Sequence, residues 1–288
     1  MGFLSCFEDL RLNEKTAKQE HDPSSAIRDS FIYKSLLPPA VKILGRWRPR
    51  LAPRVLMLTS NRILKYGLNT PLSEAHAIDF ISRNTSLPVP RIITAFRSKN
   101  GECYILMTRC PGVPLCNVFG TLSPQEQSSV LSQLRGYIDE LRAIVPPRPG
   151  HVGATDYGPI HDERVHELPC GPFDNVADFH KAIRGGCDYP TEHEELDRMI
   201  AVQDGRDYDV KFTHGDLAFR NVICNHGKIT GIVDWESAGW YPDYWEYAMT
   251  WDSFWDNPAL RHRIHEIMET FPNEREMERT RRRLFCGD

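Results

Sequence analysis

Three oxygen-bearing side chains, Asp216, Asn221 and Asp234, stand at spacings that can bring them together. The apolar run at 222–224 and the alternating run at 229–233 are separated by turn residues, which predicts two antiparallel strands. Asn221 immediately precedes the first strand and Asp234 immediately follows the second. Because a hairpin reverses the chain, we expect Asn221 and Asp234 to lie at the same end of it, with Asp216 one loop upstream.

Carboxylate and amide oxygens are the ligands that a hard divalent cation prefers, and Mg²⁺ usually completes its shell with water and substrate phosphates. In kinases, one Asp accepts the proton of the substrate hydroxyl, an Asn five residues later binds the metal, and a separate Asp binds it too. Asp216 and Asn221 keep that spacing. The pattern therefore predicts phosphoryl transfer, with Asp216 as base, Asn221 and Asp234 as Mg²⁺ ligands, and His214 positioning the loop.

These residues stand in two longer motifs, His-Gly-Asp-Leu-x-x-x-Asn at 214–221 and Ile-Val-Asp-Trp-Glu at 232–236. The pair resembles the aminoglycoside phosphotransferase family, a branch of the kinase-like superfold in which Gly215 stands where protein kinases usually have Arg. Further stretches at 85–91, 171–173 and 238–247 are similar to the fungal members of that family. The resemblance covers roughly residues 51–256.

The resemblance implies an α+β, two-lobed protein-kinase-like fold. A small antiparallel-sheet lobe that binds nucleotide is expected at 51–107, a hinge at 108–112, and a larger, mainly helical lobe with the catalytic and acceptor-binding residues at 113–288. Residues 1–50 form a leader of unassigned structure. The implied enzyme is an ATP:alcohol phosphotransferase that uses ATP and Mg²⁺ and moves the γ-phosphoryl group onto a hydroxyl of a small molecule.

A hairpin at 55–58 and 62–66 is predicted by its apolar pattern and carries Lys65 on the second strand. The next segment, 70–81, predicts a helix capped by Thr70 that carries Glu74. Taken alone, Lys65 fits an edge-strand lysine that faces water. A strand lysine followed by a helix glutamate is also the pair that holds the ATP phosphates in kinase-like enzymes.

Two further strands are predicted at 91–96 and 103–107. The residues after them resemble the hinge of the family, where the backbone of Thr108 and Cys110 would hydrogen-bond adenine. An ordinary exit from strand to loop is equally compatible with the composition. One feature departs from kinases: no glycine-rich loop precedes Lys65, and the turn at 59–61 reads Thr-Ser-Asn.

Four helices are predicted after residue 122. Capping boxes of the form Ser/Thr-x-x-Glu open the first at Ser123 and the third at Thr191. Apolar spacing marks the others. They are expected at 123–145, 176–183, 191–200 and 260–271. The aromatic run at 240–255 is expected to be mostly core, and the basic run at 279–283 a solvated face.

Composition narrows the class of protein. The chain has 288 residues, a hydrophobic fraction of 41%, a charged fraction of 26% and a net charge of −4, which is typical of a globular protein and argues against nucleic-acid binding. No apolar run is long enough for a transmembrane helix. Eight cysteines without a C-x-x-C pair, and no secretory signal, favour a reducing cytoplasmic setting. Residues 1–6 approach the myristoylation pattern, but Cys6 stands where Ser or Thr is expected.

The segment 151–209 contains fourteen Asp or Glu and five Lys or Arg. This excess fits either solvated helix faces or a pocket for a cationic acceptor. Two rival functions also remain open. A binding or scaffold protein without turnover is favoured by the missing glycine-rich loop and disfavoured by the set of Asp216, Asn221 and Asp234. A protein kinase is disfavoured, because no Ala-Pro-Glu segment or activation loop follows Asp234. The sequence leaves the oligomeric state open.

Overall fold

The computed structural model describes residues 27–28, 30–166, 168–254 and 258–286. The lipidation pattern at 1–6 and the first half of the leader lie outside the described residues. The chain divides into two compact units, the sheet unit (Asp22–Leu141 and Leu217–Glu236) and the helical unit (Arg142–Asp216 and Ser237–Asp288). The lobe boundaries placed around 108–112 stay a prediction.

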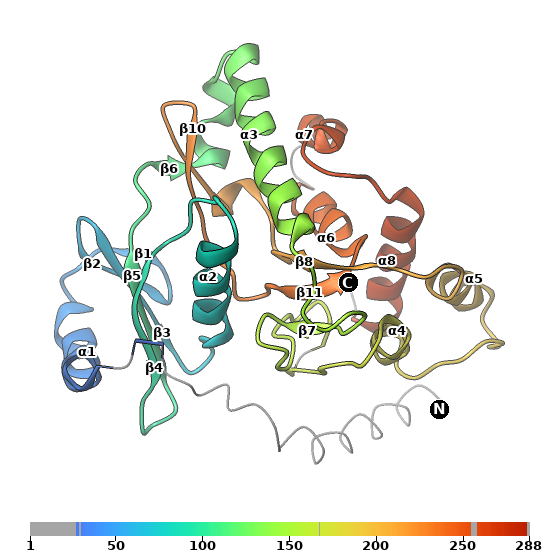
Figure 1. Cartoon of the computed structure of the whole chain (residues 1–288), viewed down its shortest axis with the longest axis horizontal. Coiled ribbons are helices and arrows are strands. Elements are labelled where there is room, and N and C mark those ends of the chain that lie inside the picture. The colour runs from blue at the N-terminus through green and yellow to red at the C-terminus, as the bar shows by residue number, and fades with distance from the viewer. Residues whose placement is uncertain (1–26, 29, 167, 255–257, 287–288) are drawn as a thin grey trace. The chain divides into compact units, whose positions relative to one another are not determined.

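An antiparallel sheet of five strands, in the order β1-β2-β3-β5-β4, forms much of the sheet unit (Figure 1). The two hairpins expected from the apolar patterns are present, which confirms those predictions. Strand β1 was missed, because its three residues are all exposed and no alternation marks it. The strands are β1 (Arg50–Ala52), β2 (Val55–Thr59), β3 (Arg62–Gly67), β4 (Ile92–Arg97) and β5 (Cys103–Thr108).

Two helices accompany this sheet. Helix α1 (Phe31–Leu44) lies in the leader, whose structure the sequence left unassigned, and continues through two prolines. Packing stabilises it, since Leu37 is buried and Tyr33 and Val41 are partly buried against the same cluster as the sheet. The sheet contributes Leu64, Phe96, Tyr104 and Leu106 to this cluster.

The expected capping of helix α2 by Thr70 is wrong. Helix α2 (Ser73–Asn84) has Leu72 at its N-cap position and no side-chain cap. A residue before proline is biased towards extended backbone, so Thr70, which precedes Pro71, stands outside the helix. The helix still carries Glu74 in its first turn, as predicted.

A second, three-stranded sheet holds the hairpin found in the sequence. Strands β9 (Val222–Asn225) and β10 (Lys228–Ile232) pair antiparallel, and β6 (Val113–Pro114) pairs with β9. The N–H of Val233 donates to the Asn221 carbonyl at 2.9 Å, so the two ends of the hairpin meet as expected. Short 3-10 helices accompany this sheet: η2 (Leu115–Asn117), η3 (Phe119–Thr121) and η4 (Phe219–Asn221).

Helix α3 (Pro124–Ala143) begins with the expected capping box. The Ser123 hydroxyl donates to Glu126 at 2.7 Å, and Glu126 also accepts the Ser123 N–H at 2.8 Å. Further along α3, Gln133 contacts the turn of the β9–β10 hairpin, accepting from the N–H of Ile229 at 3.1 Å. This contact ties α3 to the element that carries Asn221 and Asp234.

The helical unit contains a small sheet of order β7-β11-β8 and several helices. The aromatic run is mostly core, as predicted: Trp240, Tyr241, Tyr244 and Trp245 are all buried. Its strands are β7 (Gly153–Ala154), β8 (Val210–Thr213) and β11 (Gly239–Pro242), and its helices are α4 (Val176–Ile183), α5 (Glu194–Gln203), α6 (Trp245–Ser253), α7 (Pro258–His262), η5 (Ile264–Glu266) and α8 (Pro272–Phe285).

Three local predictions in this unit are wrong. Helix α5 is capped by His193 instead of Thr191, whose N–H donates to Asp197. The stripe at 260–271 is buried at four positions but is divided between α7 and η5. Arg281, expected on a solvated face, is fully buried, because it forms an ion pair with Glu278 at 2.7 Å.

No helix in the described part of the chain combines the length and apolar character needed to cross a membrane.

Candidate active site

Lys65 is the centre of a cluster of charges in the sheet unit. It lies on β3, with a side chain only 7% exposed, and its Nζ is 2.7 Å from Glu74, 2.7 Å from Asp234 and 3.0 Å from Glu236. Glu74 comes from α2, so the structure brings the predicted lysine and glutamate together. The alternative of a lysine that faces water is excluded by its burial.

The protonation of this cluster follows from its burial and its charges. Burial opposes the charge on Lys65, but Glu74, Asp234 and Glu236 outweigh that effect and raise the pKa of Lys65 far above its usual value. Burial raises the pKa of Glu74 to about 7, against the opposing effect of Lys65. Three carboxyl groups thus share one ammonium group, and the cluster carries an excess of acidic groups.

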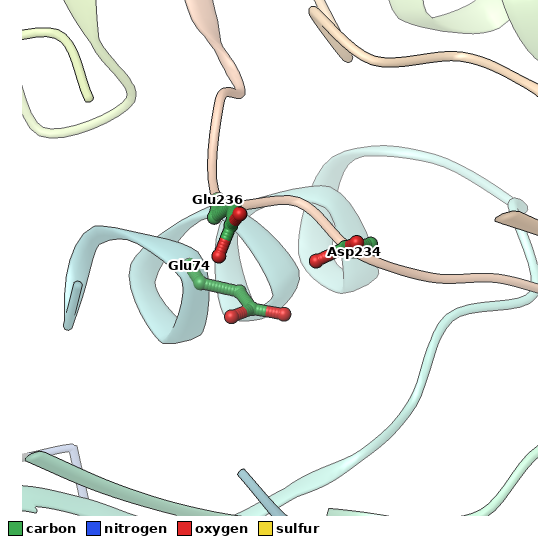
Figure 2. Close-up of side chains that lie close together, drawn as sticks. All are labelled: Glu74, Asp234 and Glu236. Atoms are coloured by element: carbon green, nitrogen blue, oxygen red, sulfur yellow. The ribbon is translucent and has the colours of Figure 1, made fainter. Parts of the chain in front are cut away.

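Figure 2 shows the three carboxyl groups of Glu74, Asp234 and Glu236 turned towards one another, and one oxygen of each lies within 4.8 Å of the others. Sequence reasoning missed Glu236. Its signal was its place in the Ile-Val-Asp-Trp-Glu motif, two residues after the predicted metal ligand Asp234. Asp234 has a φ of 68°, which is uncommon for a residue other than glycine and frequent at functional sites.

A cavity of about 460 Å³ adjoins this cluster within the sheet unit. Lys65, Glu74, Asn221 and Asp234 all line it, so four of the residues selected from the sequence meet at one cavity. The rest of its lining is largely apolar. It includes Leu51, Ala52, Val55, Ile63, Met107, Pro114, Ile223 and Val233. An apolar cavity with a few convergent polar groups is the usual form of a site for a small molecule or cofactor.

The expected hinge contributes to the same cavity through Cys110, with Met107 and Arg109 beside it, whereas Thr108 is not part of the lining. The Thr108 N–H donates to the Arg91 carbonyl at 3.0 Å. The contacts of Thr108 and Cys110 with adenine stay predictions.

The turn next to the cavity differs from the one selected in the sequence. Residues 59–61 are absent from the lining, which instead contains Pro53 and Arg54 from the two-residue turn between β1 and β2. The reason is the extra strand β1, which places another hairpin before Lys65. Arg54 donates to the Asn69 carbonyl and forms an ion pair with Glu236 at 3.4 Å.

The oxygen ligands beside the cavity fit a hard divalent cation. Asn221 supplies an amide and Asp234 a carboxylate, both at the lining, and Glu236 lies next to Asp234. Such oxygen donors are those that Mg²⁺ takes. A cation would also offset the excess of carboxyl groups around Lys65. The residues present therefore fit Mg²⁺.

The other two predicted site residues, His214 and Asp216, belong to the helical unit. Their loop follows β8 and is held by a buried carboxylate: Glu246 of α6 accepts the N–H of His214 at 2.5 Å and the N–H of Gly215 at 3.3 Å. His214 Nδ1 accepts the Asp216 N–H at 3.2 Å. His214 thus contacts the backbone of the loop, with its Nδ1 as an acceptor, and its role in positioning Asp216 stays a prediction.

Gly215 occupies its position for a steric reason. Its φ is +82°, and a Cβ there would lie 2.5 Å from the Ser237 carbonyl oxygen, so an arginine does not fit. The guanidinium of Arg164, from another segment of the chain, reaches the loop that contains Gly215. It donates to the Gly215 carbonyl and lies 3.4 Å from Asp216.

Arg164 is itself held on both sides. Its guanidinium pairs with the buried Asp162 at 2.7 Å. Its carbonyl accepts from Arg281 of α8 at 2.6 Å, and Arg281 is paired with Glu278. The two charges of α8 therefore fix the segment that touches Asp216. Sequence reasoning missed Arg164, because nothing near it in the chain marks its partner 52 residues away.

The family to which the chain belongs is shown by its sequence. The pattern of the phosphotransferase enzyme family (APH) matches residues 50–281, which is most of the chain and contains every site residue named above. The chain belongs to this family. A comparison with curated proteins finds no match.

Solved structures of the phosphotransferase family have the same fold. Aminoglycoside phosphotransferase APH(4)-Ia is 15% identical with a TM-score of 0.59, covering 88% of this chain and 90% of that one. A thermostable mutant of APH(4)-Ia, in a ternary complex with ADP and hygromycin B, is 15% identical with a TM-score of 0.56, covering 86% and 88%. APH(3'')-Id from Streptomyces rimosus is 13% identical with a TM-score of 0.54, covering 87% and 98%. These similarities confirm the kinase-like α+β fold class.

The acidic excess of the segment 151–209 has a local explanation in this family member. Seven of its carboxylates have partners within the helical unit, either basic side chains or backbone N–H groups. These are Asp156, Asp162, Asp188, Glu194, Glu195, Asp197 and Asp204, and an eighth, Asp178, accepts from the side-chain amide of Asn175. These pairings account for part of the acidic excess, and both interpretations of the segment stay predictions.

Proposed function

We propose that the protein transfers the γ-phosphoryl group of ATP to a hydroxyl of a small molecule. The observation that carries this proposal is the meeting of Lys65 with Glu74 and Asp234 at a cavity of about 460 Å³. A buried lysine fixed by a helix glutamate is the arrangement that orients ATP phosphates in kinase-like enzymes. The ADP complex of a structural neighbour supports nucleotide as the donor.

On the nucleotide side, Lys65 binds phosphate. The backbone of the hinge, at Thr108 and Cys110, contacts adenine. Asn221 and Asp234 hold Mg²⁺, which supplies neutralisation of phosphate charge when it is bound. Arg54 compensates for the missing glycine-rich loop. Its guanidinium lies beside Glu236 at the cavity, and guanidinium groups bind phosphate through paired hydrogen bonds.

On the acceptor side, Asp216 accepts the proton of the hydroxyl. His214 and Arg164 position Asp216, one through the backbone and the other through its carboxylate. Because the phosphoryl transition state is loose, positioning and charge neutralisation provide most of the catalysis. Such positioning groups must hold their geometry before the substrate arrives, which the buried Glu246 and Arg281 ensure.

The acceptor is a hydroxylated small molecule. Hygromycin B in the neighbour's complex is one of that class, and the pairing of the carboxylates in 151–209 gives no reason to restrict the acceptor to cations. A screen of hydroxylated metabolites for an ATP-dependent mass gain of one phosphoryl group would identify it. The motifs at 85–91 and 238–247 support placement among the fungal members, and the scattered cysteines support a reducing cytoplasmic setting.

Thermal and chemical unfolding test nucleotide binding before the acceptor is known. Mg·ATP at about 100 times its dissociation constant should stabilise the protein by about 2.7 kcal/mol. Mg²⁺ and ATP together should act more strongly than either alone, since phosphate oxygens complete the shell that Asn221 and Asp234 begin. Absence of any shift at millimolar Mg·ATP would contradict the proposal. A shift without hydrolysis or transfer to any acceptor would favour the rival function, a binding protein without turnover.

A further inference from the structure

Large apolar side chains on α1 and the turn after it are exposed. Six of the eleven exposed large apolar residues in the described chain fall between residues 31 and 51. Ile32, Leu36 and Ile43 are 65%, 59% and 64% exposed, and their spacing of four and seven residues places them on one side of the helix. Trp47, 83% exposed, follows in the turn. We call these four residues the outer stripe.

The outer stripe is not the side that holds α1 to the protein. Leu37 is buried, and Tyr33 and Val41 pack with it against the cluster that includes Leu64 of β3. The helix therefore has one apolar side in the core and a second one in water. A helix that is apolar on two sides is typical of an element with contacts on both.

The charge of this segment indicates what covers the second side. Residues 31–54 contain six Lys or Arg and no Asp or Glu, although the whole chain has a net charge of −4. Lys42, Arg46 and Arg48 are exposed beside Ile43 and Trp47. A partner for this surface therefore has to be apolar and negatively charged at once. A second copy of the chain is disfavoured, because joining two such surfaces brings like charges together.

We propose that the outer stripe and its basic flank dock on an anionic lipid bilayer surface. A helix with exposed Trp, Leu and Ile on one side and Lys or Arg beside them lies in the headgroup region of such a bilayer. The apolar side chains enter the interface, and the basic side chains interact with anionic headgroups. The protein would thus be recruited to a membrane surface without crossing it. This inference does not depend on the proposed phosphotransferase activity.

Flotation of the full-length protein with vesicles tests the proposal. Binding to vesicles of phosphatidylserine and phosphatidylcholine should exceed binding to pure phosphatidylcholine by at least tenfold and should fall as salt is raised. The double variant Ile43→Ser, Trp47→Ser should bind about tenfold more weakly, because it removes apolar side chains that would enter the bilayer interface. Both side chains lie outside the core, so folding should be unaffected. Arg46→Gln with Arg48→Gln should weaken binding about tenfold through charge alone.

Matched controls are available elsewhere on the surface. Leu68→Ser and Val145→Ser change side chains that are 68% and 79% exposed and lie outside the stripe, so they should leave vesicle binding unchanged. Failure of the full-length protein to bind anionic vesicles would overturn the proposal, as would equal binding by the stripe variants and the controls. A dimer that dissociates in the stripe variants, without vesicle binding, would instead assign the surface to self-association. Retention of the parental melting temperature in the stripe variants separates loss of docking from loss of folding.

Discussion

In the sheet unit, Lys65 meets three carboxyl groups beside a cavity, whereas in the helical unit Arg281 and Glu278 pair with essentially no exposure. The first cluster has more acidic than basic groups and borders space for a ligand. The second cluster pairs one acidic group with one basic group, and Arg281 also donates a hydrogen bond to the Arg164 carbonyl. Charges near the cavity are thus placed to meet a ligand, and charges in the helical unit to hold a loop.

This difference explains why the two candidate aspartates are supported so differently. Asp234 is held by an ion pair with the side chain of Lys65 at the cavity. A charged ligand that binds in the cavity would therefore alter the electrostatic surroundings of Asp234. Asp216 stands in a loop whose backbone Glu246 and His214 fix, and its carboxylate pairs with Arg164, a residue outside the cavity. We therefore expect mutations on the nucleotide side to alter binding and mutations around Asp216 to alter turnover.

The largest effect is expected for Asp234→Ala. Loss of this carboxylate should abolish both the stabilisation by Mg·ATP and turnover, because the metal and Lys65 both lose a partner. Calorimetric titration with Mg·ATP measures the first and phosphate release the second. Asp139→Ala, which removes an exposed carboxylate on α3, is the matched control and should behave as the parent. Parental Mg·ATP affinity in Asp234→Ala would remove Asp234 from the nucleotide site.

Asp216→Asn should separate binding from turnover. Affinity for Mg·ATP should stay within about twofold of the parent, while turnover should fall ~10²–10⁴-fold, the usual contribution of a positioned acid–base group. Slow ATP hydrolysis without acceptor provides the assay, followed by transfer once an acceptor is known. Asp209→Asn, an exposed residue of the same unit, serves as control. Turnover at the parental rate in Asp216→Asn would refute the assignment of the base.

Acid should weaken the helical unit through His180. Burial and the nearby Arg184 lower the pKa of His180 to about 4, from an ordinary value of 6.5. The unfolded chain therefore binds a proton at higher pH than the folded one. This difference in proton binding stabilises the folded state above pH 6.5, and the stabilisation is lost as pH falls from 6.5 towards 4. The full loss is on the order of 3 kcal/mol.

Guanidinium unfolding followed by tryptophan fluorescence at pH 7.5, 6 and 5 measures this dependence. His180→Gln should flatten the acid side of the profile, while His262→Gln, at an exposed position of the same unit, should leave it as in the parent. A parental slope in His180→Gln would show that other groups cause the acid sensitivity.

The smallest effect is expected for Arg164→Gln. A charge-assisted hydrogen bond contributes about 1.5–3 kcal/mol, and the 3.4 Å contact with Asp216 lies at the long end of the range. Turnover should therefore fall about tenfold, with Mg·ATP affinity unchanged. Arg164→Lys should recover part of the rate, and the exposed Arg198→Gln should lose none. An equal loss of nucleotide affinity in Arg164→Gln would contradict a role confined to Asp216.

Much of the nucleotide side was predictable from the sequence. Strands β9 and β10 follow from the apolar alternation between Asn221 and Asp234, and a hairpin requires its ends to meet. The spacing of Lys65 and Glu74 belongs to a strand and the next helix, each recognisable by its own pattern. These predictions succeeded because the information lies within a few residues of the element concerned.

Prediction failed for two different reasons. Strand β1 pairs locally with β2, but none of its side chains is buried, so no pattern marked it and Arg54 was not recognised at the cavity. In the helical unit, the deciding contacts lie far along the chain. Arg164 reaches a loop 52 residues away, and Arg281 is buried although its neighbours in the chain are charged. Residue type and spacing reveal which side chains are chemically capable. Which of them share a site depends on packing and on charge compensation between distant segments, and these arise only when the chain folds.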